Sequence, residues 1–415
     1  MNSAASCGLD LAVRFHAVRQ RTLDLCKPLT PEDMMVQSCP EASPAKWHLA
    51  HTSWFFESFV LKPFLPGYRL FNDDFPWLFN SYYRTFAEFP EKRLRASFSR
   101  PGVDEVLRYR AHVDEGVDRL LAGDPPAEAL ERLILGANHE EQHQELLLTD
   151  MLHAFFTNPL RPAYLAAAEP EPSVHSELEF APFEGGLREA GYGGEAFCFD
   201  NERPRHRVWL EPYALAGRLV TCGEFAEFMA DGGYRRPELW LSAGWDAVEA
   251  NGWQAPLYWT RTEEGWTVFT LRGDLQLARM ENAPVSHVSY YEADAYARWA
   301  GYRLPAELEW EAAAEALPVE GNLLDAGRLL PVAASGGAAQ FYGDCWEWTA
   351  SAYLGYPGYR PLPGSLGEYN GKFMSGQMVL RGGSCVTPLE HIRASYRNFF
   401  PAETRWQFSG IRLAS

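Results

Sequence analysis

The sequence predicts a multidomain protein in which a helical N-terminal part precedes an α+β C-terminal part. Its 415 residues are more than one hydrophobic core usually serves, which favours two or three domains. Residues 126–156 form a long stretch of helical periodicity. From about residue 170 the chain becomes rich in Gly, Trp, Tyr and Pro, and its apolar runs shorten to strand length. We therefore expect a domain boundary here, with residues 170–176 as the linker.

Four long helices are expected in the N-terminal part. They are predicted at 9–27, from Ser43-Pro44 onward, at 101–121 and at 126–156. Thr30 followed by Pro31 predicts a further helix start, with Thr as the N-cap and Pro at the first helical position. Four long helices joined by loops predict a bundle, an architecture whose facing helices can project metal ligands inward.

Short strands and few helices are expected in the C-terminal part. Strands are predicted at 206–210, 257–260, 266–271 and 378–381, and helices at 222–231, 290–300 and 305–316. The helix at 222–231 follows a threonine N-cap. This mixture, with long irregular stretches between the elements, predicts an α+β domain.

Charge and composition narrow the possible functions. The formal net charge of −18 repels nucleic acid and anionic membranes, and no basic cluster offsets it. No run of about 18 apolar residues predicts a membrane span, and the N-terminus does not resemble a secretory signal. Seven widely spaced cysteines without a C-x-x-C motif favour reduced thiols and a cytoplasmic location. Small-molecule chemistry is therefore expected.

A metal site is predicted by His139 and His143, which lie four residues apart in the expected helix 126–156. This spacing places two imidazoles on one helix face, one turn apart. Glu145 is only two residues from His143 and so points elsewhere, which suits a supporting role. The alternative is a pair of core histidines bonded to the backbone.

A third ligand is expected from His48 or His51, upstream in the helix that follows Ser43. The two are three residues apart, so both lie roughly on one face, and the sequence alone does not choose between them. Three protein ligands would leave metal coordination positions open, which indicates chemistry and not a structural clamp.

Two aromatic regions could also take part in chemistry. Tyr82 and Tyr83 are interpreted either as packing residues or as phenols that donate a proton or a hydrogen atom near the metal. Arginine and asparagine side chains among aromatic residues at 379–413 could bind a carboxylate. Hydrogen bonding between irregular loops is the favoured interpretation of this second region.

Several motifs carry a resemblance to known families. The C-terminal part resembles the formylglycine-generating-enzyme-like, C-type-lectin-like fold in residues 200–206, 285–299, 303–310, 343–349, 380–384 and 410–413. The N-terminal part resembles the DinB-type four-helix bundle, whose H-x-x-x-H-x-E signature is His139, His143 and Glu145 here. The combination resembles the hercynine oxygenases, the sulfoxide synthases of ergothioneine biosynthesis. The resemblance implies a DinB-like bundle at 9–165 and a formylglycine-generating-enzyme-like domain at 177–415.

The resemblance implies a metal centre and a reaction. A non-haem Fe(II) ion would be held by His51, His139 and His143. With O2, the family joins a thiol to C2 of the hercynine imidazole and forms a sulfoxide. Open metal positions let imidazole, thiolate and O2 meet in one place. The cysteine pair of the formylglycine-generating enzymes is not evident, because Cys345 and Cys385 lie in motifs that are structural in this fold.

The resemblance also implies roles for individual side chains. Tyr82 and Tyr83 match the branch of the family in which the phenol comes from this pair. Gln142 matches a residue that contacts hercynine, and Asn398 matches one near the hercynine carboxylate. Arg84 and Arg397 are expected to recognise the carboxylate of the thiol substrate, and Tyr369 or Phe399 to contact the trimethylammonium group of hercynine.

The thiol donor is expected to be free cysteine. Phe399-Phe400 stand where the branch that uses γ-glutamylcysteine has Trp-Asp, so a polar partner for the longer dipeptide is missing. Alternatives are the same chemistry with γ-glutamylcysteine or with another thiol or selenol donor, and a non-catalytic metal-binding, lectin-like module. The sequence leaves the oligomeric state open.

Overall fold

The chain forms two compact units in the computed structural model, which describes residues 2–166, 175–336 and 339–415 and side chains from Asp10 onward. The first unit is Met1–Leu160 with Pro363–Tyr369, and the second is Arg161–Leu362 with Asn370–Ser415. Residues 170–174 of the expected linker lie outside the described residues. The segment Pro363–Tyr369 differs from the sequence expectation, which placed it in the second domain.

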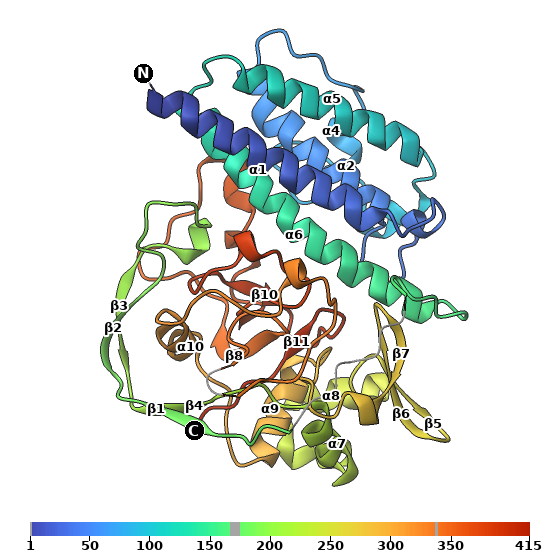
Figure 1. Ribbon diagram of the computed structural model, residues 1–415, viewed down its shortest axis with the longest axis vertical. Coiled ribbons are helices and arrows are strands. Elements are labelled where there is room, and N and C mark those ends of the chain that lie inside the picture. The colour runs from blue at the N-terminus through green and yellow to red at the C-terminus, as the bar shows by residue number, and fades with distance from the viewer. Residues whose placement is uncertain (1, 167–174, 337–338) are drawn as a thin grey trace. The chain divides into compact units, whose positions relative to one another are not determined.

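Four long helices pack alongside one another in the first unit (Figure 1). They are α1 (Asn2–Cys26), α2 (Ala45–Phe56), α5 (Val103–Leu121) and α6 (Ala127–Thr157). A π-helical segment (Glu57–Leu61) and α3 (Lys62–Phe64) continue α2, and α4 (Phe75–Leu78) follows. Short 3₁₀ helices lie at Asp33–Met35 and Lys92–Ser97. The predicted bundle is confirmed.

The helix start predicted at Thr30 produces only one 3₁₀ turn. The Asp33 N–H donates to Thr30 Oγ1 at 3.2 Å, and the Thr30 N–H donates to Asp33 Oδ2 at 2.9 Å. The turn ends at Val36, whose backbone is extended with φ −73° and ψ 132°. Pro40 follows closely and cannot supply a helical N–H, so the capped turn does not grow into a helix.

Helix α2 is the centre of the bundle. Every one of its residues is buried, and it packs against both α5 and α6. Gly136 of α6 faces Phe56 of α2, and a Cβ at this glycine would collide with the phenylalanine ring. The two helices can therefore approach closely, which matters because they carry the histidines of interest.

Four small sheets, four α-helices and several short 3₁₀ helices make up the regular structure described for the second unit. Two sheets have two strands each: β1 (Phe180–Phe183) with β4 (Tyr213–Ala216), and β2 (Gly186–Ala190) with β3 (His206–Leu210). The third sheet has the strands β5 (Trp259–Thr262), β6 (Gly265–Thr270) and β7 (Gly273–Gln276). The fourth has, in spatial order, β10 (Asn398–Phe400), β9 (Met378–Arg381), β8 (Trp346–Ala352) and β11 (Ser409–Gly410). The α-helices are α7 (Cys222–Ala230), α8 (Ser242–Asn251), α9 (Tyr290–Trp299) and α10 (Glu307–Ala314).

The four-stranded sheet places the C-terminal motifs side by side. In this sheet β9 pairs antiparallel with both β8 and β10, and β11 pairs parallel with β8. Sequence periodicity located β3 and β9 at the observed bounds. It missed helix α8 and the strands β1, β2, β4, β7, β8, β10 and β11. The residues of β8 do alternate between apolar and polar, but the polar side chains of its first half are buried, and Glu347 accepts from Trp310 and Arg412.

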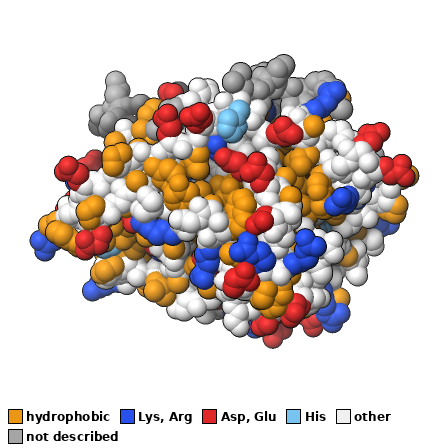
Figure 2. Space-filling view, turned by 90° about the horizontal axis from the view of Figure 1, so that it is seen from below, with side chains coloured by type: hydrophobic (Ala, Val, Ile, Leu, Met, Phe, Trp, Pro, Cys, Tyr) orange, Lys and Arg blue, Asp and Glu red, His pale blue; other side chains and the backbone are white. Residues whose placement is uncertain are grey.

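Acidic and basic side chains are intermixed on the face drawn in Figure 2. Among the described residues, no helix has both the length and the apolar character that a bilayer span requires. None of the six cysteines whose side chains are described forms a disulfide.

Candidate metal centre

His51, His139 and His143 come together in the first unit. His51 projects from α2, and the other two project from α6 one turn apart. Their candidate ligand atoms all lie within 4.8 Å of one another, and the three side chains are buried. The ring centroids are 5.1 Å apart for His51–His139, 4.7 Å for His51–His143 and 4.6 Å for His139–His143. Three imidazoles at this spacing can share one ion.

The hydrogen bonds of these rings fit a cation. His51 Nδ1 lies 2.7 Å from the carbonyl oxygen of Phe79, which makes Nδ1 the donor and leaves Nε2 with a free lone pair. His51 Nε2 and both ring nitrogens of His139 have no hydrogen-bond partner among the described residues. Buried polar atoms are rarely left unpaired. A bound metal ion would take His51 Nε2 and one of the two His139 nitrogens, and the backbone contact would orient the His51 ring.

His48 occupies a different position from His51. Its Nδ1 lies 2.8 Å from Nδ1 of His143, and its Nε2 lies 3.1 Å from Oδ2 of Asp150. Both ring nitrogens are therefore engaged, so His51 and not His48 completes the three-histidine group. Glu145 is not part of that group. Sequence reasoning missed Asp150, although it lies seven residues after His143, two turns along the same helix face.

The three imidazoles are neutral at physiological pH. Burial lowers the pKa of His139 to about 3. Burial, and secondarily the neighbouring His139, lowers the pKa of His51 and of His143 well below the ordinary value. Metal ligation needs the unprotonated ring, so the site holds its ligands in the competent form.

Aromatic rings enclose His51. Trp47 stacks on it with centroids 4.4 Å apart and an interplanar angle of 14°, and Trp54 stacks on it at 5.2 Å and 13°. The guanidinium carbon of Arg95 lies 3.4 Å from the centre of a Trp47 ring. These contacts fix the His51 ring and exclude water from its faces.

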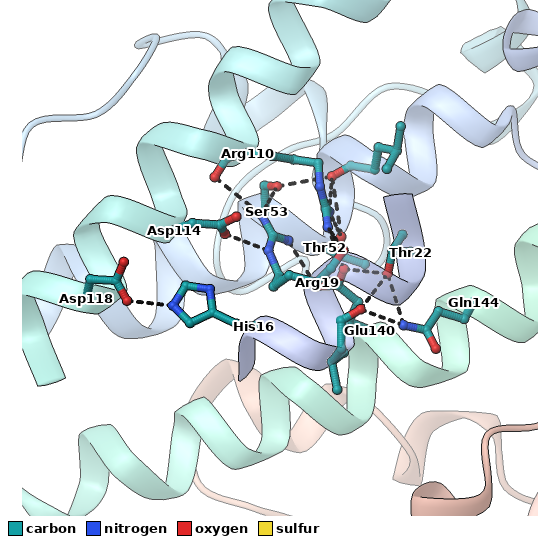
Figure 3. Close-up of polar contacts among 12 residues, drawn as sticks. His16, Arg19, Thr22, Thr52, Ser53, Arg110, Asp114, Asp118, Glu140 and Gln144 are labelled. Atoms are coloured by element: carbon teal, nitrogen blue, oxygen red, sulfur yellow. Dashed lines mark hydrogen bonds and ion pairs between the residues drawn. The ribbon is translucent and has the colours of Figure 1, made fainter. Parts of the chain in front are cut away.

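A buried ion network anchors the helix that carries the histidine pair (Figure 3). Glu140, next to His139, accepts from Arg19 Nη1 at 2.9 Å and from Arg110 Nη2 at 2.8 Å. Thr22 Oγ1 donates to the same carboxylate at 2.7 Å. Burial alone would raise the pKa of Glu140, but Arg110 and Arg19 lower it to about 2. The network ties α6 to α1 and α5 behind the histidines.

Replacing Glu140 with glutamine is expected to destabilise the protein by about 3–5 kcal/mol, because two buried guanidinium groups lose their common charged partner. Urea unfolding monitored by circular dichroism measures the change. The matched control is Glu128→Gln, which removes an exposed partner of Arg132 on the same helix and should cost less than about 1 kcal/mol. Equal losses in the two variants would contradict an anchoring role for Glu140.

Three tyrosines cluster beside the histidine group. Tyr82 lies 4.8 Å from Tyr83 and 6.1 Å from Tyr369, measured between ring centroids. The Tyr369 ring meets the His139 ring edge-on at 5.7 Å. Burial first, then a neighbouring phenol, raises the pKa of Tyr82 and of Tyr83 well above the ordinary value, so both keep their protons.

Glu368 holds Tyr369 in place. Its carboxylate accepts from the backbone N–H of Arg84 at 3.2 Å and of Thr85 at 2.9 Å. These bonds attach the segment Pro363–Tyr369 to the loop that carries Tyr82 and Tyr83. Sequence reasoning considered Tyr369 only as a cation contact, because nothing local signals a position beside His139.

The remaining predicted residues lie in both units. Gln142 is half-buried on α6, and Arg84 is exposed, with its guanidinium carbon 5.4 Å from the Phe89 ring centre. Asn398, Phe399 and Phe400 form β10 of the second unit and are half-buried. Nothing in these positions by itself assigns a ligand.

Arg397 has a structural position that differs from the expected substrate contact. Its Nε and Nη2 bind the two carboxylate oxygens of Glu307, each at 2.9 Å, and Nη1 donates to the carbonyl of Asn201 at 2.9 Å. The side chain is buried over the Tyr356 ring. All three nitrogens are engaged within the second unit, so a substrate carboxylate would have to break a buried ion pair. Arg397 is therefore a residue that holds the loops together.

Comparisons with known proteins match both units. Residues 14–148 match the DinB superfamily, and residues 167–324 and 330–415 match the sulfatase-modifying factor enzyme 1-like domain. The chain is 32% identical to a hercynine oxygenase of Mycolicibacterium smegmatis, over 97% of this chain and 98% of that one. It is 32% identical to a hercynine oxygenase of Mycobacterium tuberculosis, over 97% and 98%. A formylglycine-generating enzyme of Streptomyces coelicolor is 33% identical over 37% of this chain and 52% of its own length.

A DinB-type bundle with a buried three-histidine group, together with a sulfatase-modifying-factor-like domain, defines a two-domain oxygenase. The chain aligns with nearly the full length of both mycobacterial relatives, and this identifies the family within that class. The chain belongs to the hercynine oxygenase family.

Proposed function

We propose that this protein is a non-haem Fe(II), O2-dependent sulfoxide synthase. It joins the thiol of cysteine to C2 of the hercynine imidazole in ergothioneine biosynthesis. The observation that carries the proposal is the buried group of His51, His139 and His143, in which three ring nitrogens lack a hydrogen-bond partner among the described residues. Family membership supports the substrate, since the relatives are named hercynine oxygenases.

Ferrous iron bound by the three histidines would supply open coordination positions for thiolate and O2 and the electrons that start oxygen reduction. The protein contributes neutral ligands, so the site attracts a thiolate without competing negative charge. Trp47 and Trp54 stack on the two faces of His51 and fix the orientation of the ring whose Nε2 would hold the ion. The phenols of Tyr82 and Tyr83 hold protons that can be given to reacting oxygen.

Hercynine recognition is proposed for Gln142, Asn398 and an aromatic ring. Asn398 Oδ1 accepts from the Phe399 N–H at 2.8 Å, while its Nδ2 donates to none of the described residues. The Nδ2 group is thus available to a carboxylate. For the trimethylammonium group, Tyr369 is favoured over Phe399, because Phe399 already stacks on Tyr353 with centroids 4.0 Å apart. Arg84, exposed and without an ion pair in the described residues, is proposed for the cysteine carboxylate.

Replacing Phe400 with aspartate is expected to shift donor preference toward γ-glutamylcysteine by about tenfold or more, because a polar partner for the longer donor is restored. Phe400 is half-buried and packs edge-on against Trp406 at 5.4 Å, so the change also opens space. The measurement is the ratio of kcat/KM values for the two thiols. Phe400→Ala is the matched control, since it opens the space without adding a charge. If both variants keep the wild-type ratio, the basis for choosing cysteine is lost.

The proposed function is tested by loading the protein with Fe(II) under anaerobic conditions and then adding O2. Hercynine is offered with cysteine, with γ-glutamylcysteine or with no thiol, and the products are identified by mass. A cysteine–hercynine sulfoxide that requires iron and O2 is expected. A γ-glutamyl product alone would move the donor to the dipeptide. Metal binding without O2 consumption under any condition would favour a non-catalytic metal-binding module.

A further inference from the structure

We propose that His48 and Asp150 are positioning residues that orient His143 and tune the metal it holds. This inference rests on the proposed iron centre. The geometry is a chain of three side chains, in which His143 Nδ1 faces His48 Nδ1 at 2.8 Å and His48 Nε2 faces Asp150 Oδ2 at 3.1 Å. All three side chains are buried.

The direction of the two hydrogen bonds follows from the groups at either end of this series of three side chains. Asp150 is a carboxylate and accepts only, so His48 Nε2 carries the hydrogen. In the tautomer with its hydrogen on Nε2, His48 has a lone pair on Nδ1 and accepts the Nδ1–H of His143. His143 is left with its lone pair on Nε2, which is the tautomer that binds a metal through that atom. One carboxylate thus selects the tautomers of two imidazoles.

The negative charge of Asp150 is what distinguishes this relay from ordinary packing. The Asp150 carboxylate, which accepts the hydrogen bond of His48, pulls protons toward itself. The His143 ring thereby becomes a stronger electron-pair donor to the metal. Stronger electron-pair donation from His143 would stabilise ferric iron more than ferrous iron. Asp150 also accepts the Ser43 N–H at 2.8 Å, just before α2, and this second bond is the structural contribution that a test must separate.

The critical variant is Asp150→Asn, which keeps an oxygen that can accept from the Ser43 and His48 groups but removes the charge. His48→Phe is the second variant, since it keeps a ring and removes the acceptor for His143. The matched control is Asp118→Asn, because Asp118 accepts from His16 Nε2 at 2.7 Å in an exposed Asp–His pair of the same unit (Figure 3).

Three measurements on the full chain distinguish the roles. Anaerobic titration with Fe(II) gives the affinity, a redox titration gives the Fe(III)/Fe(II) midpoint potential, and the nitric oxide adduct of the ferrous protein gives an electron paramagnetic resonance spectrum. Asp150→Asn and His48→Phe are each expected to weaken Fe(II) binding by about 10- to 100-fold. They should also raise the midpoint potential and change the spectrum, whereas Asp118→Asn should match the wild type.

The inference is overturned if Asp150→Asn and His48→Phe bind Fe(II) with wild-type affinity, potential and spectrum, even if their melting temperatures fall. A fall in stability alone would assign the relay to packing. The wild-type titration tests the proposed centre separately. If the wild type fails to bind Fe(II), the iron centre and the inference both fail, whereas tight wild-type binding with unchanged variants removes only the inference.

Discussion

Replacing His139 with alanine is expected to abolish iron retention and product formation. His139 is buried, and neither of its ring nitrogens has a hydrogen-bond partner among the described residues. The variant therefore removes a proposed ligand without breaking a protein hydrogen bond, and the main structural loss is ring packing against Phe55 at 4.7 Å. With two imidazoles remaining, the site should lose most of its affinity for Fe(II). Metal content after anaerobic loading and desalting measures the effect.

His153→Ala is the control for this prediction. His153 lies on the same helix and bonds to Ser38 Oγ at 2.7 Å, away from the three-histidine group. The control should keep iron and activity, while His143→Ala should behave like His139→Ala. Unchanged iron content in either ligand variant, in a protein that still folds, would refute the ligand assignment.

The double variant Tyr82→Phe with Tyr83→Phe is expected to redirect O2 from C–S coupling to oxidation of the thiol. Both phenols keep their protons because burial raises the pKa of each well above the ordinary value. Loss of a positioned proton donor usually costs about 10²- to 10⁴-fold in rate. We expect coupling to fall within this range while cysteine sulfinic acid accumulates. Product ratios by mass analysis, with O2 consumption measured in parallel, test the expectation.

Two further variants locate the donor. Tyr68→Phe is the control, because its hydroxyl donates to Glu57 at 2.8 Å elsewhere in the bundle and should not affect the product ratio. Tyr369→Phe tests the third phenol, whose ring lies 5.7 Å from the His139 ring. Wild-type coupling in the Tyr82/Tyr83 double variant, with redirection in Tyr369→Phe, would place the donor in the segment Pro363–Tyr369.

The sequence by itself determined the features that depend on neighbouring residues. The spacing of His139 and His143 fixes one helix face, because helical geometry is local. The same reasoning located α9, β3 and β9, whose periodicity or bounding residues carry a local signal. It did not identify β8, although Trp346–Ala352 alternates between apolar and polar residues.

The tertiary structure decided which distant groups meet. His48 and His51 are indistinguishable by spacing, and only packing of α2 against α6 gives His51 to the metal group and His48 to Asp150. In the same way, Glu368 brings Tyr369 to His139, and Glu307 holds Arg397 in a buried ion pair. Each outcome depends on contacts between residues far apart in the chain. Such contacts are set by burial and by the pairing of polar groups in the folded core, and a sequence does not display them.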